Sequence, residues 1–214
     1  MNDKVYIHAI SGKDHRFINK NQEETLSKIL SSRKLLSLTK QGINENPSYA
    51  GLDYISLSDY EKRSLYPENH RFYNAYYLFS RNYIGLAFDK ENLDTIIPTF
   101  IENNDEYIFE RKNKKKIDII NERYTDLMDE VQVKDSINLE LLSYITYPTS
   151  TFIRDNSILS TDKKYEILID RINRLYGILK SMGYNVDIYD IDTLTKMDND
   201  GIRKLIYKSN CWQK

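Results

Sequence analysis

Residues 82–89, Asn-Tyr-Ile-Gly-Leu-Ala-Phe-Asp, form an apolar run that ends at a polar turn. A short apolar run bounded by turn residues is typical of a β-strand that is buried on both faces. Strands of this kind lie inside a sheet. The stretch therefore predicts a central strand, around which the other segments are arranged.

Two strands and one helix are predicted before this run. Residues 4–9, Lys-Val-Tyr-Ile-His-Ala, are rich in strand-forming side chains, and residues 53–58 alternate between polar and apolar. Between them, residues 22–33 place their leucine and isoleucine side chains at helical spacing. The N-terminal half thus predicts one helix and several short strands, which irregular connections join.

Further elements are predicted after the central run: a short helix at 91–97 ending at Pro98, strands at 106–110 and 129–133, a short helix at 138–145, a long helix at 162–182, a strand at 186–191 and a helix at 194–207. In the long helix, Asp162 is expected to cap the start and Gly183 the end. Short strands without regular crossover helices predict an α+β fold. We expect two packed, mostly antiparallel sheets or a split central sheet, flanked by helices 22–33 and 162–182, in one domain spanning 1–214.

Composition excludes several functional classes. The chain has 31 Lys and Arg against 32 Asp and Glu, for a net charge of −1, so no global field attracts nucleic acid or acidic membranes. Its one cysteine, Cys211, cannot form an internal disulfide, and no cluster has zinc-ligand spacing. No run of about 18 apolar residues is present. We therefore expect a monomer that acts in a cytoplasm, its own cell's or a host's, without a metal or a membrane.

Most enzyme signatures are missing, but one ordered set of residues remains. The sequence lacks a Gly-rich phosphate loop, a His-Glu-x-x-His motif and a nucleophile elbow. His8 lies in the first predicted strand, and a helix with Thr-Leu-x-x-Ile-Leu-Ser-Ser at 25–32 follows it. Then come Tyr-Ile-Ser-Leu-Ser at 54–58, the central strand, and Glu-Val-Gln-Val at 130–133. Because side chains alternate along a strand, Glu130 and Gln132 are expected on one face.

This order resembles the ADP-ribosyltransferase superfamily, especially the bacterial DNA-targeting toxins and the poly-ADP-ribose polymerase branch. In that family a first-strand His precedes a helix ending in Ile-Leu-x-x-Gly-Leu, a strand bearing Tyr and Ser, and a strand with the catalytic Glu. The resemblance covers roughly residues 5–147, and the chain departs from it at Arg33-Lys34, where the family has Gly. It implies an ADP-ribosyltransferase-like split β-sandwich with flanking helices.

The resemblance also implies roles for individual residues, with NAD⁺ as the substrate. Glu130 would stabilise the oxocarbenium-like ribose that forms when the nicotinamide bond breaks. The residues implied in NAD⁺ binding are His8, Ser11, Tyr54, Ser56 and Tyr73. Gln132 would contact the acceptor, and either Glu130 or Gln132 could occupy the catalytic position.

Three functions follow as alternatives. The first is a toxin- or effector-like mono-ADP-ribosyltransferase that modifies a protein side chain or a base of single-stranded nucleic acid. The second is an NAD⁺ glycohydrolase with water as the acceptor. The third is a non-catalytic interaction or inhibitor protein that binds a partner through the Tyr-rich segment 60–81. Whether His8 and Glu130 share one cleft is the observation that best separates them.

Overall fold

The structure is a computed structural model that describes residues 4–10, 20–42, 53–61, 81–95, 98–103, 106–111 and 130–209. The helices and strands in this part of the chain are, in order, β1 (Val5–Ala9), α1 (Lys20–Ser32), β2 (Lys34–Leu36), β3 (Tyr54–Asp59), β4 (Gly85–Asp89), β5 (Pro98–Asn103), β6 (Glu106–Arg111), β7 (Glu130–Lys134), β8 (Ser136–Asn138), β9 (Leu142–Tyr147), α4 (Thr149–Asp155), α5 (Thr161–Ser181), β10 (Ile188–Asp190) and α6 (Asn199–Ser209).

Six strands form one central sheet in the order β10-β9-β4-β1-β3-β7. The β10–β9 pair is parallel, and the other neighbours are antiparallel. The apolar run that predicted a central strand is β4, which lies between β9 and β1. A mixed sheet with helices beside it is an α+β fold, so this prediction is confirmed.

The seam between β1 and β3 divides this sheet. These strands are paired only at Tyr6–Asp59 and Ile7–Ser58, whereas β1 pairs with β4 at five positions, as β3 does with β7. The sheet therefore consists of two halves joined at a short seam, which is the split form of the predicted architecture. Two small antiparallel pairs, β2–β8 and β5–β6, lie outside it.

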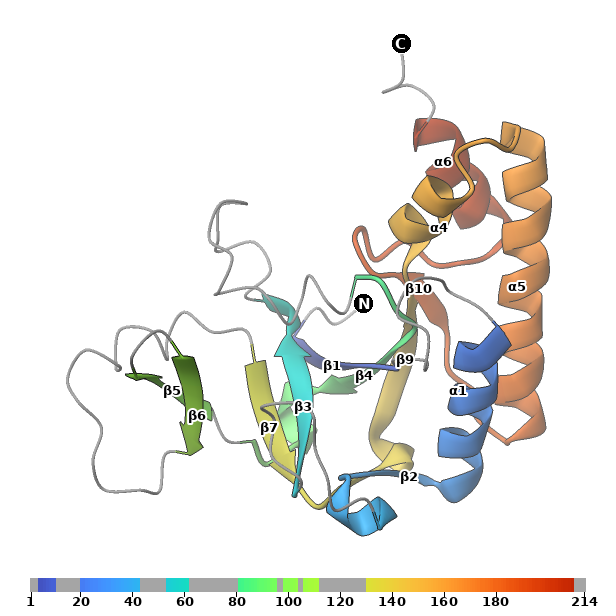
Figure 1. Cartoon of the computed structure of the whole chain (residues 1–214). Coiled ribbons are helices and arrows are strands. Elements are labelled where there is room, and N and C mark those ends of the chain that lie inside the picture. The colour runs from blue at the N-terminus through green and yellow to red at the C-terminus, as the bar shows by residue number, and fades with distance from the viewer. Residues whose placement is uncertain are drawn as a thin grey trace.

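Helices α1, α5 and α6 lie together on one side of the sheet (Figure 1). Their apolar stripes pack on the strands because leucine and isoleucine recur at helical spacing on the buried faces. The fully buried contributors from these helices are Leu26, Leu30, Leu168, Ile172, Leu175, Leu179, Ile202 and Ile206, and they meet Leu57, Leu86, Phe88 and Ile145 of the sheet. The predicted helices 22–33 and 162–182 are confirmed as α1 and α5.

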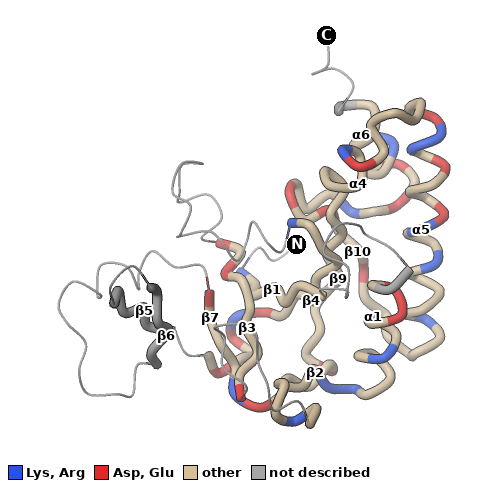
Figure 2. Tube along the Cα trace, in the orientation of Figure 1, with Lys and Arg blue, Asp and Glu red and all other residues tan. Residues whose placement is uncertain are grey.

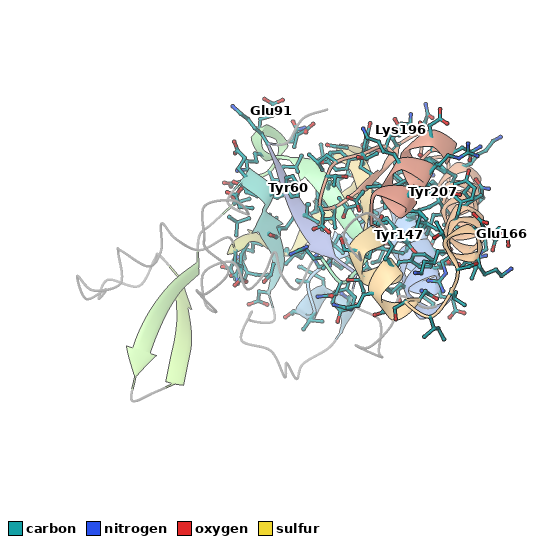
Figure 3. All side chains as sticks on the ribbon, turned by 90° about the horizontal axis from the view of Figure 1, so that it is seen from above. Tyr60, Glu91, Tyr147, Glu166, Lys196 and Tyr207 are labelled. Atoms are coloured by element: carbon teal, nitrogen blue, oxygen red, sulfur yellow. The ribbon has the colours of Figure 1, made fainter. Side chains whose placement is uncertain are left out.

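A smaller apolar cluster covers part of the opposite face. It consists of Val5, Ile7, Tyr60, Ala87, Tyr144 and Ile191. Tyr60, labelled in Figure 3, is fully buried and donates its hydroxyl to the Ile191 carbonyl at 2.7 Å. This bond ties the end of β3 to the chain after β10.

Two predicted helices are wrong. Residues 91–97 were expected to be helical, but a 3₁₀ turn at Lys90–Asn92 leads into extended chain, and Pro98 begins β5. Residues 138–145 were expected to be a helix, but a 3₁₀ turn at Leu139–Leu141 leads into β9. Short segments of this kind fit helix and strand equally well. Pairing with β4 decided for the strand in β9, and pairing with β6 did so in β5.

The start of the long helix also differs from the prediction. Ser160, not Asp162, is the N-cap, and its side chain accepts a hydrogen bond from the Lys163 amide at 3.3 Å. An N-cap oxygen must reach an amide two or three residues on, which the spacing from Ser160 to Lys163 allows. Asp162 lies within the first turn, where its charge complements the helix dipole. Gly183 follows the helix with φ of 79°, as predicted for the glycine that ends it.

Helix α5 carries both basic and acidic residues along its length (Figure 2). Helix α6 has Asp200 in its first turn and Arg203, Lys204 and Lys208 after it. Among the described helices, none is long and apolar enough to cross a membrane.

Candidate active site

His8 lies in β1 at the seam of the sheet. Its Nδ1 is 3.0 Å from the Ser56 carbonyl oxygen on β3, just past the last backbone pair between these strands. A carbonyl oxygen can only accept, so in the neutral ring Nδ1 carries the proton and Nε2 is the acceptor nitrogen. Burial lowers the pKa of His8 below its ordinary 6.5, and the bond to Ser56 opposes this shift. The site thus holds a neutral imidazole with a defined tautomer.

Glu130 begins β7, the strand at the edge of the sheet. Its side chain is buried, and Gln132 donates from Nε2 to its Oε1 at 3.1 Å. Burial raises the pKa of Glu130, while hydrogen bonds from Ser56 and Gln132 partly offset the rise because they favour the carboxylate. A carboxyl group in this setting is a candidate for chemistry, because buried groups with shifted pKa values cluster at functional sites.

The register places four of the candidate side chains on one face. Across the β3–β7 pair, Glu130 lies opposite Ser58 and Gln132 lies opposite Ser56. Tyr54 is on β3, two residues before Ser56. Directly opposed residues of antiparallel strands share a face, and residues two apart on one strand do so as well. The prediction that Glu130 and Gln132 point the same way is therefore confirmed, and Tyr54 and Ser56 join them.

His8 points to the other face. Ile7 is opposite Ser58 and so shares the face of Glu130, which turns the next residue, His8, to the opposite side. The Ser56 carbonyl accepts from His8, and the Ser56 side chain lies on the face of Glu130. This register does not bring His8 and Glu130 onto one face of the sheet, and by the criterion of a shared cleft that arrangement favours the non-catalytic alternative.

Ser11 and Tyr73, also candidates for NAD⁺ binding, lie outside the described residues, as does most of the Tyr-rich segment. Ser58 was not among the predicted site residues, but it is fully buried directly across from Glu130. Alternation along residues 54–58 places Tyr54, Ser56 and Ser58 on one face and could have identified it. Among the described residues, no group of three or more His, Cys, Asp or Glu is arranged to hold a metal ion.

Acid is expected to destabilise the protein through His8. In the unfolded chain the imidazole protonates near pH 6.5, but in the folded chain it does so at lower pH. Stability is therefore present above pH 6.5 and is lost as pH falls from 6.5 toward the folded pKa. Urea unfolding between pH 7.5 and 5 should show that His8→Asn loses less stability than the parent over this range. Tyr6→Phe, two residues earlier on the same strand and face, should follow the parent, and equal losses in all three proteins would remove His8 as the cause.

No family model matches the sequence, and no curated protein matches it. Solved structures of DarT from Thermus sp. 2.9 are similar in fold. The complexes with carba-NAD⁺ and with NAD⁺ each share 12% identity at a TM-score of 0.43, over 94% of this chain and 98% of that one. The complex with ADP-ribosylated single-stranded DNA shares 13% identity at a TM-score of 0.42, over 87% and 93%.

Proposed function

We propose that the chain is an NAD⁺-dependent ADP-ribosyltransferase that modifies a macromolecule. The observation that carries the proposal is the set of polar side chains at the seam: buried Glu130, which accepts a hydrogen bond from Gln132, and neutral His8, which donates to the Ser56 carbonyl of the strand paired with β7. A dinucleotide has two riboses, so the two residues can serve different halves of one ligand. The proposed setting is a cytoplasm, and the proposed working form is a monomer.

The proposed chemistry follows from the residue types. Breaking the bond between nicotinamide and ribose leaves positive charge on the ribose ring, and a nearby carboxylate stabilises that charge more in the transition state than in the ground state. Glu130 is assigned this role, and Gln132 holds its oxygen through the 3.1 Å bond. The acceptor nitrogen of His8 is suited to a ribose hydroxyl. Tyr54 offers an aromatic surface on the face of Glu130 for stacking.

The choice of acceptor stays open between a protein side chain and a base in single-stranded nucleic acid. NAD⁺ and single-stranded DNA are the first molecules to try, because they are the ligands of the DarT structures. NAD⁺ with a labelled adenylate would be incubated with single-stranded oligonucleotides and, separately, with a cell lysate. Loss of bound label after nuclease or after protease treatment identifies the acceptor. Nicotinamide released at the same rate without any acceptor would instead mark a glycohydrolase.

NAD⁺ is expected to raise the melting temperature. A ligand that binds only the folded state at 100 times its Kd stabilises by about 2.7 kcal/mol, which is about 5–10 °C for a chain of this length. His8→Ala should reduce the shift, and Tyr6→Phe should retain it. Differential scanning fluorimetry with millimolar NAD⁺ measures all three. An unchanged melting temperature in the parent would favour the non-catalytic interaction protein.

A further inference from the structure

The seam between β1 and β3 joins the half of the sheet that carries His8 to the half that carries Glu130. The inner half is β10-β9-β4-β1, and the outer half is β3-β7. Only two register pairs, both at the end of β3, join β1 to β3, and the bond from His8 Nδ1 to the Ser56 carbonyl follows them. So short a ladder fixes the angle between the halves weakly, and side-chain contacts across the seam can decide it.

An ion pair crosses the seam on the face of His8. Lys90 follows β4 in the inner half, and its Nζ lies 2.5 Å from Asp59 Oδ1 at the end of β3. The same Nζ lies 5.2 Å from the centroid of the Tyr6 ring on β1 and also pairs with Glu61. The Lys90 and Asp59 side chains are only 21% and 8% exposed, so solvent screens this pair less than it screens a surface pair.

A hydrogen bond crosses the seam on the opposite face. The fully buried Tyr60 follows β3 directly, and its hydroxyl donates to the Ile191 carbonyl, beyond β10, at 2.7 Å. Its ring belongs to one apolar cluster with Val5 and Ile7 of β1. The backbone of Tyr60 therefore continues the outer half, while its ring and hydroxyl contact the inner half.

We propose that Lys90 and Tyr60 are positioning residues for the transfer reaction. From opposite faces they hold the end of β3 against the inner half, and so they fix Glu130 relative to His8. Their influence reaches Glu130 through β3, because Ser58 lies directly opposite it on β7. This inference rests on the proposed function, since it assigns the two contacts to that reaction.

Tyr60→Phe is the first test, because it removes the cross-seam hydrogen bond and keeps the ring. Turnover depends on the alignment of the reacting groups, so kcat should fall about tenfold or more. The KM for NAD⁺ should change less than about twofold, because no group that contacts the ligand is removed. Initial rates of labelled ADP-ribose transfer at varied NAD⁺ separate the two constants. Tyr176→Phe is the matched control: it also loses a hydroxyl, one that accepts from the Ile188 amide at 3.2 Å, and it should keep the parental kcat.

The Lys90 variants test the contact on the other face. Lys90→Met should lower kcat in the same way, and Lys90→Arg, which can still pair with Asp59, should restore most of it. Because Lys90→Met leaves a buried carboxylate without its cation, the double variant Lys90→Met/Asp59→Asn removes that charge and keeps the chain folded. The double variant should retain the low kcat. A parental kcat in it, or a kcat that follows the melting temperature in every variant including Tyr176→Phe, would overturn the proposal.

Hydrogen exchange separates failure of this inference from failure of the proposed function. In the ¹⁵N-labelled full chain, the His8 Nδ1 proton and the amides that bond β1 to β3 should exchange about 3–10-fold faster in Tyr60→Phe than in the parent. The amides between β4 and β9 should change less. An equal change in both groups would overturn the inference, whatever happens to transfer. A parent that transfers no ADP-ribose to any acceptor would refute the proposed function, and faster exchange at the seam would then still support Tyr60 as a residue that fixes the two halves.

Discussion

Glu130→Gln is expected to lower the turnover of ADP-ribose transfer by about 10²–10³, equivalent to about 3–4 kcal/mol of transition-state stabilisation. The substitution keeps the shape of the side chain and removes its negative charge. NAD⁺ affinity should change far less, because the carboxylate acts mainly on the charge that develops in the transition state. Transfer of labelled ADP-ribose, measured beside NAD⁺-dependent melting, separates the two effects.

The same variant should be more stable than the parent at neutral pH. Burial raises the pKa of Glu130 above its ordinary 4.5, so the stability that this group contributes is present below pH 4.5 and is lost as pH rises through the folded pKa. Glutamine does not titrate, so the gain should appear at pH 7 and vanish below pH 4.5. Glu91→Gln, at an exposed carboxylate, is the matched control and should alter neither activity nor stability. Full transfer activity in Glu130→Gln would falsify the assignment.

Gln132 provides the companion variant. Gln132→Ala removes the donor that lies 3.1 Å from Glu130 Oε1, so the carboxyl should become harder to ionise. The pH at which activity rises should therefore move upward, with a smaller loss of turnover at high pH than in Glu130→Gln. If Gln132→Ala abolishes transfer at every pH and Glu130→Gln does not, Gln132 holds the essential position.

Gly85→Ala is expected to lower stability by about 1–3 kcal/mol, a fall in Tm of about 3–10 °C. A Cβ at Gly85 would lie 2.3 Å from Thr146 Oγ1 and 2.6 Å from Ile7 Cγ2. Both contacts are closer than atoms can approach, and both come from the strands that flank β4 on either side. The sheet must shift at its centre to accept the methyl group, and thermal or urea unfolding measures the cost.

A double variant identifies the cause. Thr146→Ala removes the nearest clashing atom, so Gly85→Ala should cost less in the Thr146→Ala background than in the parent, and the difference is the coupling energy. Gly177→Ala is the control, because a Cβ there meets nothing within 4 Å and lies on helix α5. Since alanine favours helix over glycine, this control should be neutral or slightly stabilising. Equal costs in both backgrounds would show that Thr146 is not the obstacle.

Periodicity predicted the elements that are strongly patterned. The stripe of α5 is a long 3.6-residue repeat, which fits a helix and not a strand. The apolar run of β4 is too short for a helix that is bounded by turn residues, so its length favoured the strand. The segments at 91–97 and 138–145 are short and mix polar and apolar residues without a clear period. Their structure depends on a neighbour: residues 142–147 are extended because β4 offers an edge to pair with.

The candidate site was predicted in part. Alternation along residues 130–133 was enough to place Glu130 and Gln132 together, since the period of a strand is fixed at two. Alternation does not determine burial, and only the folded chain shows that Glu130 is buried. The importance of Ser56, whose carbonyl accepts from His8, depends on a contact between residues 48 positions apart in the sequence.

The sequence by itself determined the fold class, the main helices, the central strand and the faces of residues 130–133, because these follow from local periodicity and from the alternation of side chains. Tertiary structure alone decided two things: the pairing order of the strands and the turning of His8 to the face opposite Glu130. Each depends on register between distant segments, and a shift of one residue in any of these pairs would exchange the two faces of the sheet. Local sequence sets which side chains alternate, but only the paired strand fixes the face on which each of them lies.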